Sequence, residues 1–239
     1  MDKNNVIRRD RRLFLKTLGI IPGVIFLGGG LLLPPKSMAG VIDNVIDEYI
    51  YRRQRPLPEF KFGNQEKGEK RILVAYASKY ESTAEVSKVI GERVYGTGTV
   101  AVDVIPLERV GAVDGYDGVI IGSPIYYERW REEAIVFVRR HRETLKLLPV
   151  AYFMLCMTMR IASEENKAQA RGYIDEVVKG IPEIRPVDIG LFAGYIDRRK
   201  TVWLLRNYLR TRKFYTGDFR NWNAIRDWGN ALPEKLSIK

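Results

Sequence analysis

The sequence is poor in the two residue types that most often build disulfides and metal sites. Its 239 residues contain one cysteine, Cys156, and one histidine, His141. One thiol cannot form a disulfide within the chain, and one thiol with one imidazole cannot supply the ligands of a zinc finger or a multi-histidine centre. We therefore predict no metal site of these kinds. Cys156 ends an apolar run and is predicted to be a buried structural thiol. His141 lies among arginines, which disfavour its protonation, and is predicted at the surface.

The sequence also lacks an apolar run of the roughly 20 residues that a membrane span needs. The longest run, residues 18–33, contains a proline and several glycines and ends at Pro34-Pro35. It follows Asp10-Arg11-Arg12-Leu13-Phe14-Leu15-Lys16, which resembles the twin-arginine export motif, although that motif prefers Ser or Thr at the position of Asp10. Residues 1–39 are interpreted either as a twin-arginine-like signal cleaved after Ala39 or as an uncleaved anchor. Both interpretations place the protein on the periplasmic or extracytoplasmic side, or at a membrane.

Several common catalytic and nucleotide-binding motifs are absent as well. The chain has no GxxxxGK[ST] sequence, no GxSxG elbow and no paired-carboxylate arrangement, so hydrolase chemistry has no support. Gly96-Thr97-Gly98 follows a predicted helix and ends it, whereas a dinucleotide-binding loop would open one. No recognition motif for nucleic acid is present.

Residues 40–69 are predicted to form a short amphipathic helix followed by a linker. Apolar residues between Val41 and Ile50 recur at helical spacing. Residues 54–70 carry prolines, glycines and many charged side chains, which is typical of a linker. The folded domain is therefore predicted to cover residues 70–239.

Five short apolar runs alternate with helical patterns along this domain. The predicted strands are Arg71–Tyr76, Val100–Ile105, Gly118–Gly122, Val150–Cys156 and Val187–Phe192. The predicted helices are Ser82–Val94, Arg131–Thr144, Asn166–Val178 and Trp222–Leu232. Alternation of this kind indicates an α/β fold, in which helices cover both faces of a parallel sheet. We predict a five-stranded sheet of order 2-1-3-4-5, with a ligand at the carboxyl ends of its strands.

The turn after the first predicted strand has the composition of a phosphate-binding loop. Its hydroxyl groups and the N–H groups of the following helix form an anion pocket, and the candidate ligands are Ser78, Lys79, Tyr80, Ser82 and Thr83. Ser82 and Glu85 have capping-box spacing. The loop suits one phosphate group, as in FMN, more than a pyrophosphate. An ordinary serine-rich turn is the alternative.

The turns after the third and fourth strands are candidates for contacts with a flavin ring. Aromatic side chains crowd the first of these turns, where a flat isoalloxazine ring can stack on them. The second turn offers backbone contacts to the polar edge of the flavin, or simply caps the sheet. The candidates are Ser123, Pro124, Ile125, Tyr126, Tyr127 and Trp130 in one turn, and Met157 and Thr158 in the other.

These motifs together resemble a known family. Ala-Ser-Lys-Tyr-x-Ser-Thr-Ala-Glu from residue 77, Gly-Ser-Pro-Ile-Tyr from residue 122 and Gly-Leu-Phe-Ala-Gly from residue 190 resemble the flavodoxin-domain family that includes menaquinone-dependent protoporphyrinogen oxidase. The resemblance covers roughly residues 71–232. It implies a flavodoxin-like fold, FMN as the cofactor, and the site residues named above. It also implies glycine at the position of Glu81, whose carboxylate would repel a phosphate.

A basic amphipathic segment lies near the carboxyl terminus. Residues 197–215 hold seven Lys/Arg and one acidic residue, and apolar side chains between Trp203 and Leu209 recur at helical spacing. Such a segment is typical of binding to a membrane surface, and the family oxidase has a comparable stretch. A helix packed on the domain with a solvated basic side is the alternative. The formal net charge of +11 agrees with an anionic cofactor or surface but identifies neither.

Three functions stay open on the sequence. The first is an FMN-dependent oxidoreductase that passes electrons from a reduced substrate, such as protoporphyrinogen, to a quinone. The second is a non-enzymatic electron carrier, and the third is a relative of the fold that has lost its flavin. No catalytic side chain is assigned, because the flavin carries the redox step. The oligomeric state stays open.

Overall fold

The computed structural model divides the chain into two compact units, Met1–Arg55 and Pro56–Lys239. It describes residues 56–64, 70–96, 100–126, 128–196 and 216–238, and in the first unit residues 26–27 and 30–31. There β1 (Phe26–Leu27) and β2 (Gly30–Leu31) pair in antiparallel fashion. The rest of the predicted leader, the helix predicted between residues 41 and 50, and the basic segment 197–215 lie outside the described residues. Among the described helices, none is both long enough and apolar enough to cross a membrane.

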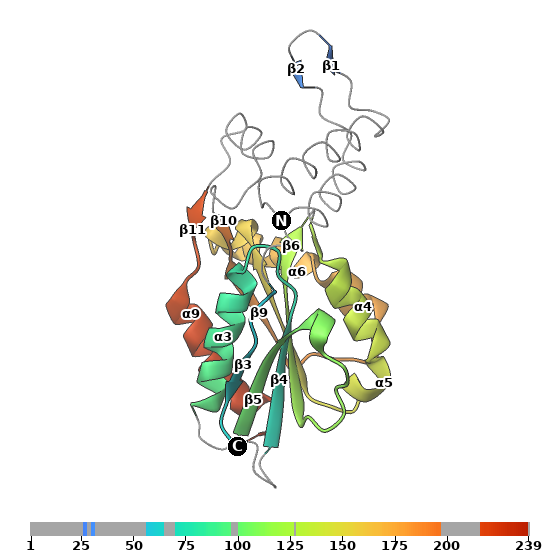
Figure 1. Cartoon of the computed structure of the whole chain (residues 1–239). Helices are drawn as coiled ribbons and strands as arrows, with labels where there is room; N and C mark the ends of the chain where they lie inside the picture. The colour runs from blue at the N-terminus through green and yellow to red at the C-terminus, as the bar shows by residue number, and fades with distance from the viewer. Residues whose placement is uncertain are drawn as a thin grey trace, which may run out of the picture. The chain divides into compact units, whose positions relative to one another are not determined.

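The second unit is built on one twisted sheet of order β3-β5-β4-β6-β8-β9 (Figure 1). Its strands are β3 (Phe60–Phe62), β4 (Lys70–Tyr76), β5 (Val100–Pro106), β6 (Gly118–Tyr126), β8 (Val150–Cys156) and β9 (Asp188–Ala193). The last five are parallel and follow the predicted order 2-1-3-4-5. The α/β fold predicted from the sequence is therefore confirmed.

The edge strand β3 corrects the prediction that residues 54–70 are only linker. Phe60–Phe62 pairs antiparallel with β5, and Phe60 lies opposite Val104. The two phenylalanines are partly buried against the core while Lys61 between them is exposed. The hydroxyl of Tyr76 also donates a hydrogen bond to the carbonyl of Pro58. Three residues are too few to show the alternation by which a strand is recognised in a sequence.

Helices cover both faces of the sheet (Figure 1). Apolar side chains of α3 (Ser82–Tyr95) and α9 (Trp222–Lys235) join one buried cluster, and those of α4 (Glu132–Arg140), α5 (Arg142–Leu145), α6 (Glu164–Gly172) and α7 (Asp175–Gly180) join another. Successive residues of β4 alternate between the two clusters, since Ile72 and Val74 join one while Leu73 and Ala75 join the other. Two predicted helices, Arg131–Thr144 and Asn166–Val178, are each divided in the structure.

The carboxyl ends of the parallel strands bring the three predicted turns to one edge of the sheet. Ala77, just after β4, donates its N–H to the carbonyl of Gly122 in β6 at 2.9 Å. Ser123 lies opposite Met154 of β8, and Cys156 lies opposite Ala193 of β9. The short strands β10 (Tyr195–Ile196) and β11 (Gly217–Asp218) pair just beyond the end of β9. The candidate residues therefore gather where this fold binds its ligands.

Candidate functional site

The turn after β4 presents hydroxyl groups that have no partner. The Ser78 Oγ and Thr83 Oγ1 atoms are buried and make no hydrogen bond among the described residues. Thr83 is 0% exposed, so a ligand reaches its hydroxyl only if the turn opens. An unpaired buried hydroxyl costs about 1–3 kcal/mol. The arrangement fits a bound group that accepts hydrogen bonds.

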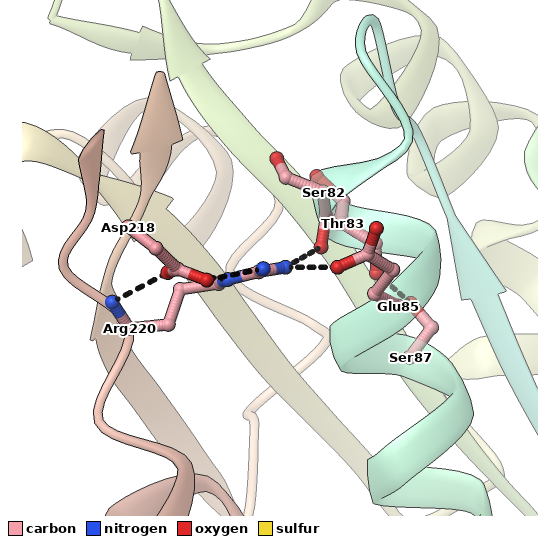
Figure 2. A network of polar contacts seen from close by, with 6 residues as sticks. All are labelled: Ser82, Thr83, Glu85, Ser87, Asp218 and Arg220. Carbon is pink, nitrogen blue, oxygen red and sulfur yellow. Dashed lines mark hydrogen bonds and ion pairs between the residues drawn. The ribbon is translucent and has the colours of Figure 1, made fainter. Parts of the chain in front are cut away.

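The first turn of α3 lacks the capping box predicted from Ser82 and Glu85. The residue before the helix is Glu81. No described side chain accepts a hydrogen bond from the backbone N–H groups in the first turn of α3. The Glu85 carboxylate instead accepts a hydrogen bond from Arg220 Nη1 at 2.7 Å (Figure 2). Uncapped N–H groups at the start of a helix are an anion-binding arrangement.

Glu81 has the left-handed backbone conformation, with φ of 68°. That conformation costs a residue with a Cβ roughly 1–2 kcal/mol, and glycine adopts it without this cost. The glycine that the family resemblance implies at this position therefore has a backbone reason. The glutamate keeps the turn but introduces strain and a negative charge beside the predicted anion site.

The second predicted turn is shorter than expected, because β6 continues through Tyr126. It pairs with β7 (Arg129–Trp130) in a tight hairpin, with Ile125 opposite Trp130. Ser123 is fully buried; its hydroxyl accepts a hydrogen bond from the Arg131 N–H at 3.1 Å and donates one to the Pro124 carbonyl at 3.0 Å. The side chain of Ser123 thus stabilises the hairpin, and Pro124 is buried beside it.

Trp130 corrects the prediction that it lines a flavin ring. Its side chain is 1% exposed and belongs to the core cluster under the helices α4 to α7. It packs edge-on against Tyr152 with ring centroids 5.2 Å apart. The side chain points into the core because, next to an antiparallel pair, alternate residues face opposite sides of the sheet. Tyr127 lies outside the described residues.

Of the aromatic candidates predicted from the sequence, Tyr80 and Tyr126 lie at this edge in the described residues, and cations accompany both. Lys79 Nζ lies 5.4 Å from the Tyr80 ring centroid and 5.1 Å from that of Tyr126. The Arg131 guanidinium lies 5.6 Å from the Tyr126 ring. Ile125 and Tyr126 are partly buried. The first and second turns are therefore joined by a basic and aromatic rim, defined here as Lys79, Tyr80, Tyr126 and Arg131.

The third turn forms the short 3-10 helix η3 (Met157–Arg160). Met157 and Thr158 are partly exposed, as a residue that borders a ligand would be. The Thr158 hydroxyl lies 3.1 Å from that of Tyr173, which fixes it against α6 and the segment that follows. The backbone of η3 begins directly at the end of β8, on the same edge as the rim.

The comparison with protein families identifies the family to which this fold belongs. The model of the family described as "Flavodoxin domain" matches residues 73–221, which is more than half of the chain. The chain belongs to the flavodoxin domain family. Flavodoxin domains bind FMN, so this protein is an FMN-binding flavoprotein of the electron-transfer class. None of the curated proteins matches the chain.

Solved flavodoxins resemble the chain at low identity. Two-electron reduced flavodoxin of Megasphaera elsdenii is 15% identical, with a TM-score of 0.46 over 68% of this chain and 98% of its own. Flavodoxin 1 of Bacillus cereus is 12% identical, with a TM-score of 0.45 over 69% and 98%. A flavodoxin from the domain Archaea is 16% identical, with a TM-score of 0.44 over 70% and 99%. The family assignment rests on the family model.

The residues of this flavodoxin domain fit FMN at the phosphate end. The unpartnered hydroxyls of Ser78 and Thr83 and the uncapped N–H groups of α3 are donors for a phosphate. No group of three or more His, Cys, Asp or Glu side chains in the described part of the chain is arranged to hold a metal ion. The donors at this end of the site therefore suit the phosphate of FMN.

Cys156 and His141 have no place among these donors. Cys156 is buried, as predicted, and burial raises the pKa of its thiol. His141 is half-buried against Phe137, with ring centroids 4.6 Å apart. Its pKa is lowered chiefly by burial and only secondarily by Arg140. The neighbouring arginines, predicted from the sequence to be the cause, therefore contribute less than burial does.

Sequence reasoning missed Arg220 and the strands β10 and β11. Arg220 contacts the first turn of α3 although the two lie 135 residues apart in the chain. In the sequence Arg220 is one more basic residue near a basic segment, and no motif marks it. Only the folded arrangement brings it to the phosphate end of the site (Figure 2).

Proposed function

We propose that this flavodoxin domain is an FMN-dependent oxidoreductase that takes electrons from a reduced, anionic substrate and passes them to a quinone at a membrane surface. The observation that carries the proposal is the place where residues 197–215 join the domain. Tyr195 pairs with Asp218 and Ile196 with Gly217, so the described residues on either side of this segment lie next to each other just beyond β9. That point lies at the carboxyl edge, where FMN is to bind.

The proposed FMN contacts divide between two ends of the site. Ser78 and Thr83 hold the phosphate through their hydroxyls, with Lys79, Tyr80 and Ser82 completing the turn. The ring lies beside the other set, which is Ile125, Tyr126, Tyr127, Met157 and Thr158. Ser123, Pro124 and Trp130 support the hairpin from within. FMN supplies the two-electron acceptor; the chain binds it, orients it and limits its contact with water.

The rim of Lys79, Tyr80, Tyr126 and Arg131 supports an anionic substrate. Two cations lie over the Tyr126 ring at the end of β6, next to the position proposed for the flavin. Arg131 is already paired with Glu133 at 2.6 Å, so a substrate carboxylate would compete for that guanidinium, while an aromatic body stacks on the tyrosines. Protoporphyrinogen, which carries carboxylates, is the donor that the family resemblance suggests. The leader-like residues 1–39 favour an extracytoplasmic donor instead, because haem synthesis is normally cytoplasmic.

The segment 197–215 supports the quinone and membrane part of the proposal. Its seven cations and its apolar residues at helical spacing suit a surface of anionic lipid. A quinone dissolved in that bilayer would then lie near the carboxyl edge of the sheet. Simple flavodoxins that only carry electrons are typically acidic, which disfavours that alternative for a chain with a net charge of +11.

Steady-state turnover tests this proposal. The purified full chain, loaded with FMN and showing a flavin visible spectrum, is assayed with a menaquinone analogue and candidate donors, including protoporphyrinogen, on vesicles containing phosphatidylglycerol. Turnover should fall when Arg206, Arg210 and Arg212 are changed to Gln, while the flavin spectrum stays unchanged. Absence of quinone reduction with every donor would assign the protein to the electron carriers, and absence of a flavin spectrum after FMN addition would remove the flavin itself.

The proposed export has its own test. A reporter fused to residues 1–39 should leave the cytoplasm, and changing Arg11 and Arg12 to Lys should stop it. Export that survives this double change would contradict a twin-arginine route.

A further inference from the structure

Arg220 is a buried arginine with a full set of partners. Its side chain is 4% exposed. It makes two hydrogen bonds to the Asp218 carboxylate, at 2.8 and 2.6 Å, and lies 4.4 Å from the Trp222 ring and 5.1 Å from the Tyr195 ring. The guanidinium is thus fixed by the base of the β10–β11 pair.

The same guanidinium reaches across to the start of α3. Its Nη1 atom donates to Glu85 Oε2 at 2.7 Å and to the Ser82 carbonyl at 3.3 Å (Figure 2). Glu85 is the acidic residue in the first turn of that helix. Figure 2 shows the Glu85 side chain directed toward Arg220, on the side of the helix that faces β11.

Without Arg220, the Glu85 carboxylate would be uncompensated in the first turn of α3. The helix begins at Ser82, so the predicted capping box does not form, but the Glu85 charge still lies close to the backbone N–H groups at the start of the helix. A carboxylate there would add a negative charge beside the phosphate donors. In the structure no side chain caps those N–H groups, and the hydroxyls of Ser78 and Thr83 also lack partners.

We propose that Arg220 is a positioning residue for the FMN phosphate: it holds the Glu85 carboxylate away from the start of α3 and balances its charge, so that the donors stay available to a phosphate dianion. This inference rests on the proposed phosphate site at Ser78–Thr83. It assigns Arg220 no contact with FMN.

The hydrogen bonds of Arg220 favour its charged form. Burial is the largest influence and lowers its pKa, but hydrogen bonds to Asp218 and Glu85 outweigh it, so the pKa lies above the ordinary value. The Arg220 hydrogen bonds likewise lower the pKa of Asp218.

The test compares FMN with riboflavin, which has the same ring but no phosphate. Dissociation constants for both are measured by quenching of flavin fluorescence. Arg220→Gln should weaken FMN binding roughly tenfold or more, because it leaves a carboxylate uncompensated beside a dianion, and riboflavin binding should change little. The double variant Arg220→Gln with Glu85→Gln should restore FMN affinity, since the repelling charge is gone.

Arg71→Gln is the matched control. Arg71 also pairs with a buried carboxylate, that of Asp103 at 2.9 Å, but near the amino end of β4. Its loss should leave the ratio of the FMN and riboflavin dissociation constants unchanged. Thermal unfolding of each flavin-free variant reports the stability change separately.

Two results would overturn the role of Arg220: an equal loss of FMN and riboflavin affinity in Arg220→Gln, or a double variant that stays as weak as the single one. If Arg220→Gln does not fold, Arg220→Lys replaces it, with a smaller loss of the same kind expected and the same two results overturning the inference. A failure of the phosphate site itself looks different, since the unchanged protein would then bind FMN and riboflavin equally.

Discussion

The turns after β4 and β6 look alike in sequence but use their hydroxyls in opposite ways. Ser78 follows β4, and Ser123 lies near the carboxyl end of β6 at the same edge of the sheet. The Ser123 hydroxyl has two partners within its own hairpin, whereas the Ser78 hydroxyl has none among the described residues. Ser123, which is structural, and Ser78, which is proposed to bind the phosphate, thus differ in their hydrogen bonds and not in their place in a motif.

A second parallel between the turns lies in their backbones. Glu81 in the first turn and Glu128 in the second both have positive φ, of 68° and 65°. Each turn therefore places a glutamate where glycine would be less strained. Only Glu81 lies beside the predicted phosphate site. Both glutamates therefore strain the backbone, but only Glu81 is expected to affect FMN affinity.

The largest expected effect concerns the packing of the second turn. Trp130→Ala should lower the free energy of unfolding by about 3–5 kcal/mol, because it removes a fully buried indole from the core. Chemical denaturation of the flavin-free protein measures this loss. Tyr126→Ala is the control, since its ring is only partly buried and should cost less. Equal losses would mean that the two aromatics do not differ in role.

The next effect concerns the hydroxyls of the first turn. Each of the single changes Ser78→Ala and Thr83→Val should weaken FMN binding on the order of tenfold to a hundredfold, because a lost donor to a charged group costs about 1.5–3 kcal/mol. Riboflavin affinity should stay close to that of the unchanged protein. Stability without flavin should stay the same or rise by up to about 1–3 kcal/mol, because neither buried hydroxyl has a partner to lose. A large loss of stability would show that these hydroxyls are structural.

The corresponding change in the second turn should have the opposite profile. Ser123→Ala should destabilise the protein by about 1–3 kcal/mol, because the buried N–H of Arg131 loses its acceptor. Denaturant midpoints measure this cost. The ratio of FMN to riboflavin affinity should not move, and a selective loss of FMN would place Ser123 at the phosphate after all.

The smallest effects concern the two strained glutamates. Glu81→Gly and Glu128→Gly should each stabilise the domain by about 1 kcal/mol, because glycine relieves a left-handed backbone. Only Glu81→Gly should also tighten FMN binding, since it removes a carboxylate from the phosphate end. Calorimetric unfolding and flavin titration separate the two outcomes. Tightening by both changes would indicate a general charge effect.

The sequence was a good guide wherever a pattern is repeated along several residues. The five parallel strands and their order follow from apolar runs that alternate with helical stripes, and the carboxyl edge follows from that order. The sequence was a poor guide where a structural feature depends on only one to three residues. Phe60–Phe62 is too short for a recognisable period, and nothing along the chain told whether Trp130 points into the core or out of it.

By itself, then, the sequence determined the α/β fold and the choice of FMN and predicted the edge proposed for the ligand, because backbone periodicity and local motifs carry that information. Only the tertiary structure decided which serine is already hydrogen-bonded, that α3 begins without the predicted capping box, and that Glu85 pairs with Arg220. The physical reason is that these are contacts between segments far apart in the chain, and a carboxylate such as Glu85 binds whichever donor the fold brings nearest.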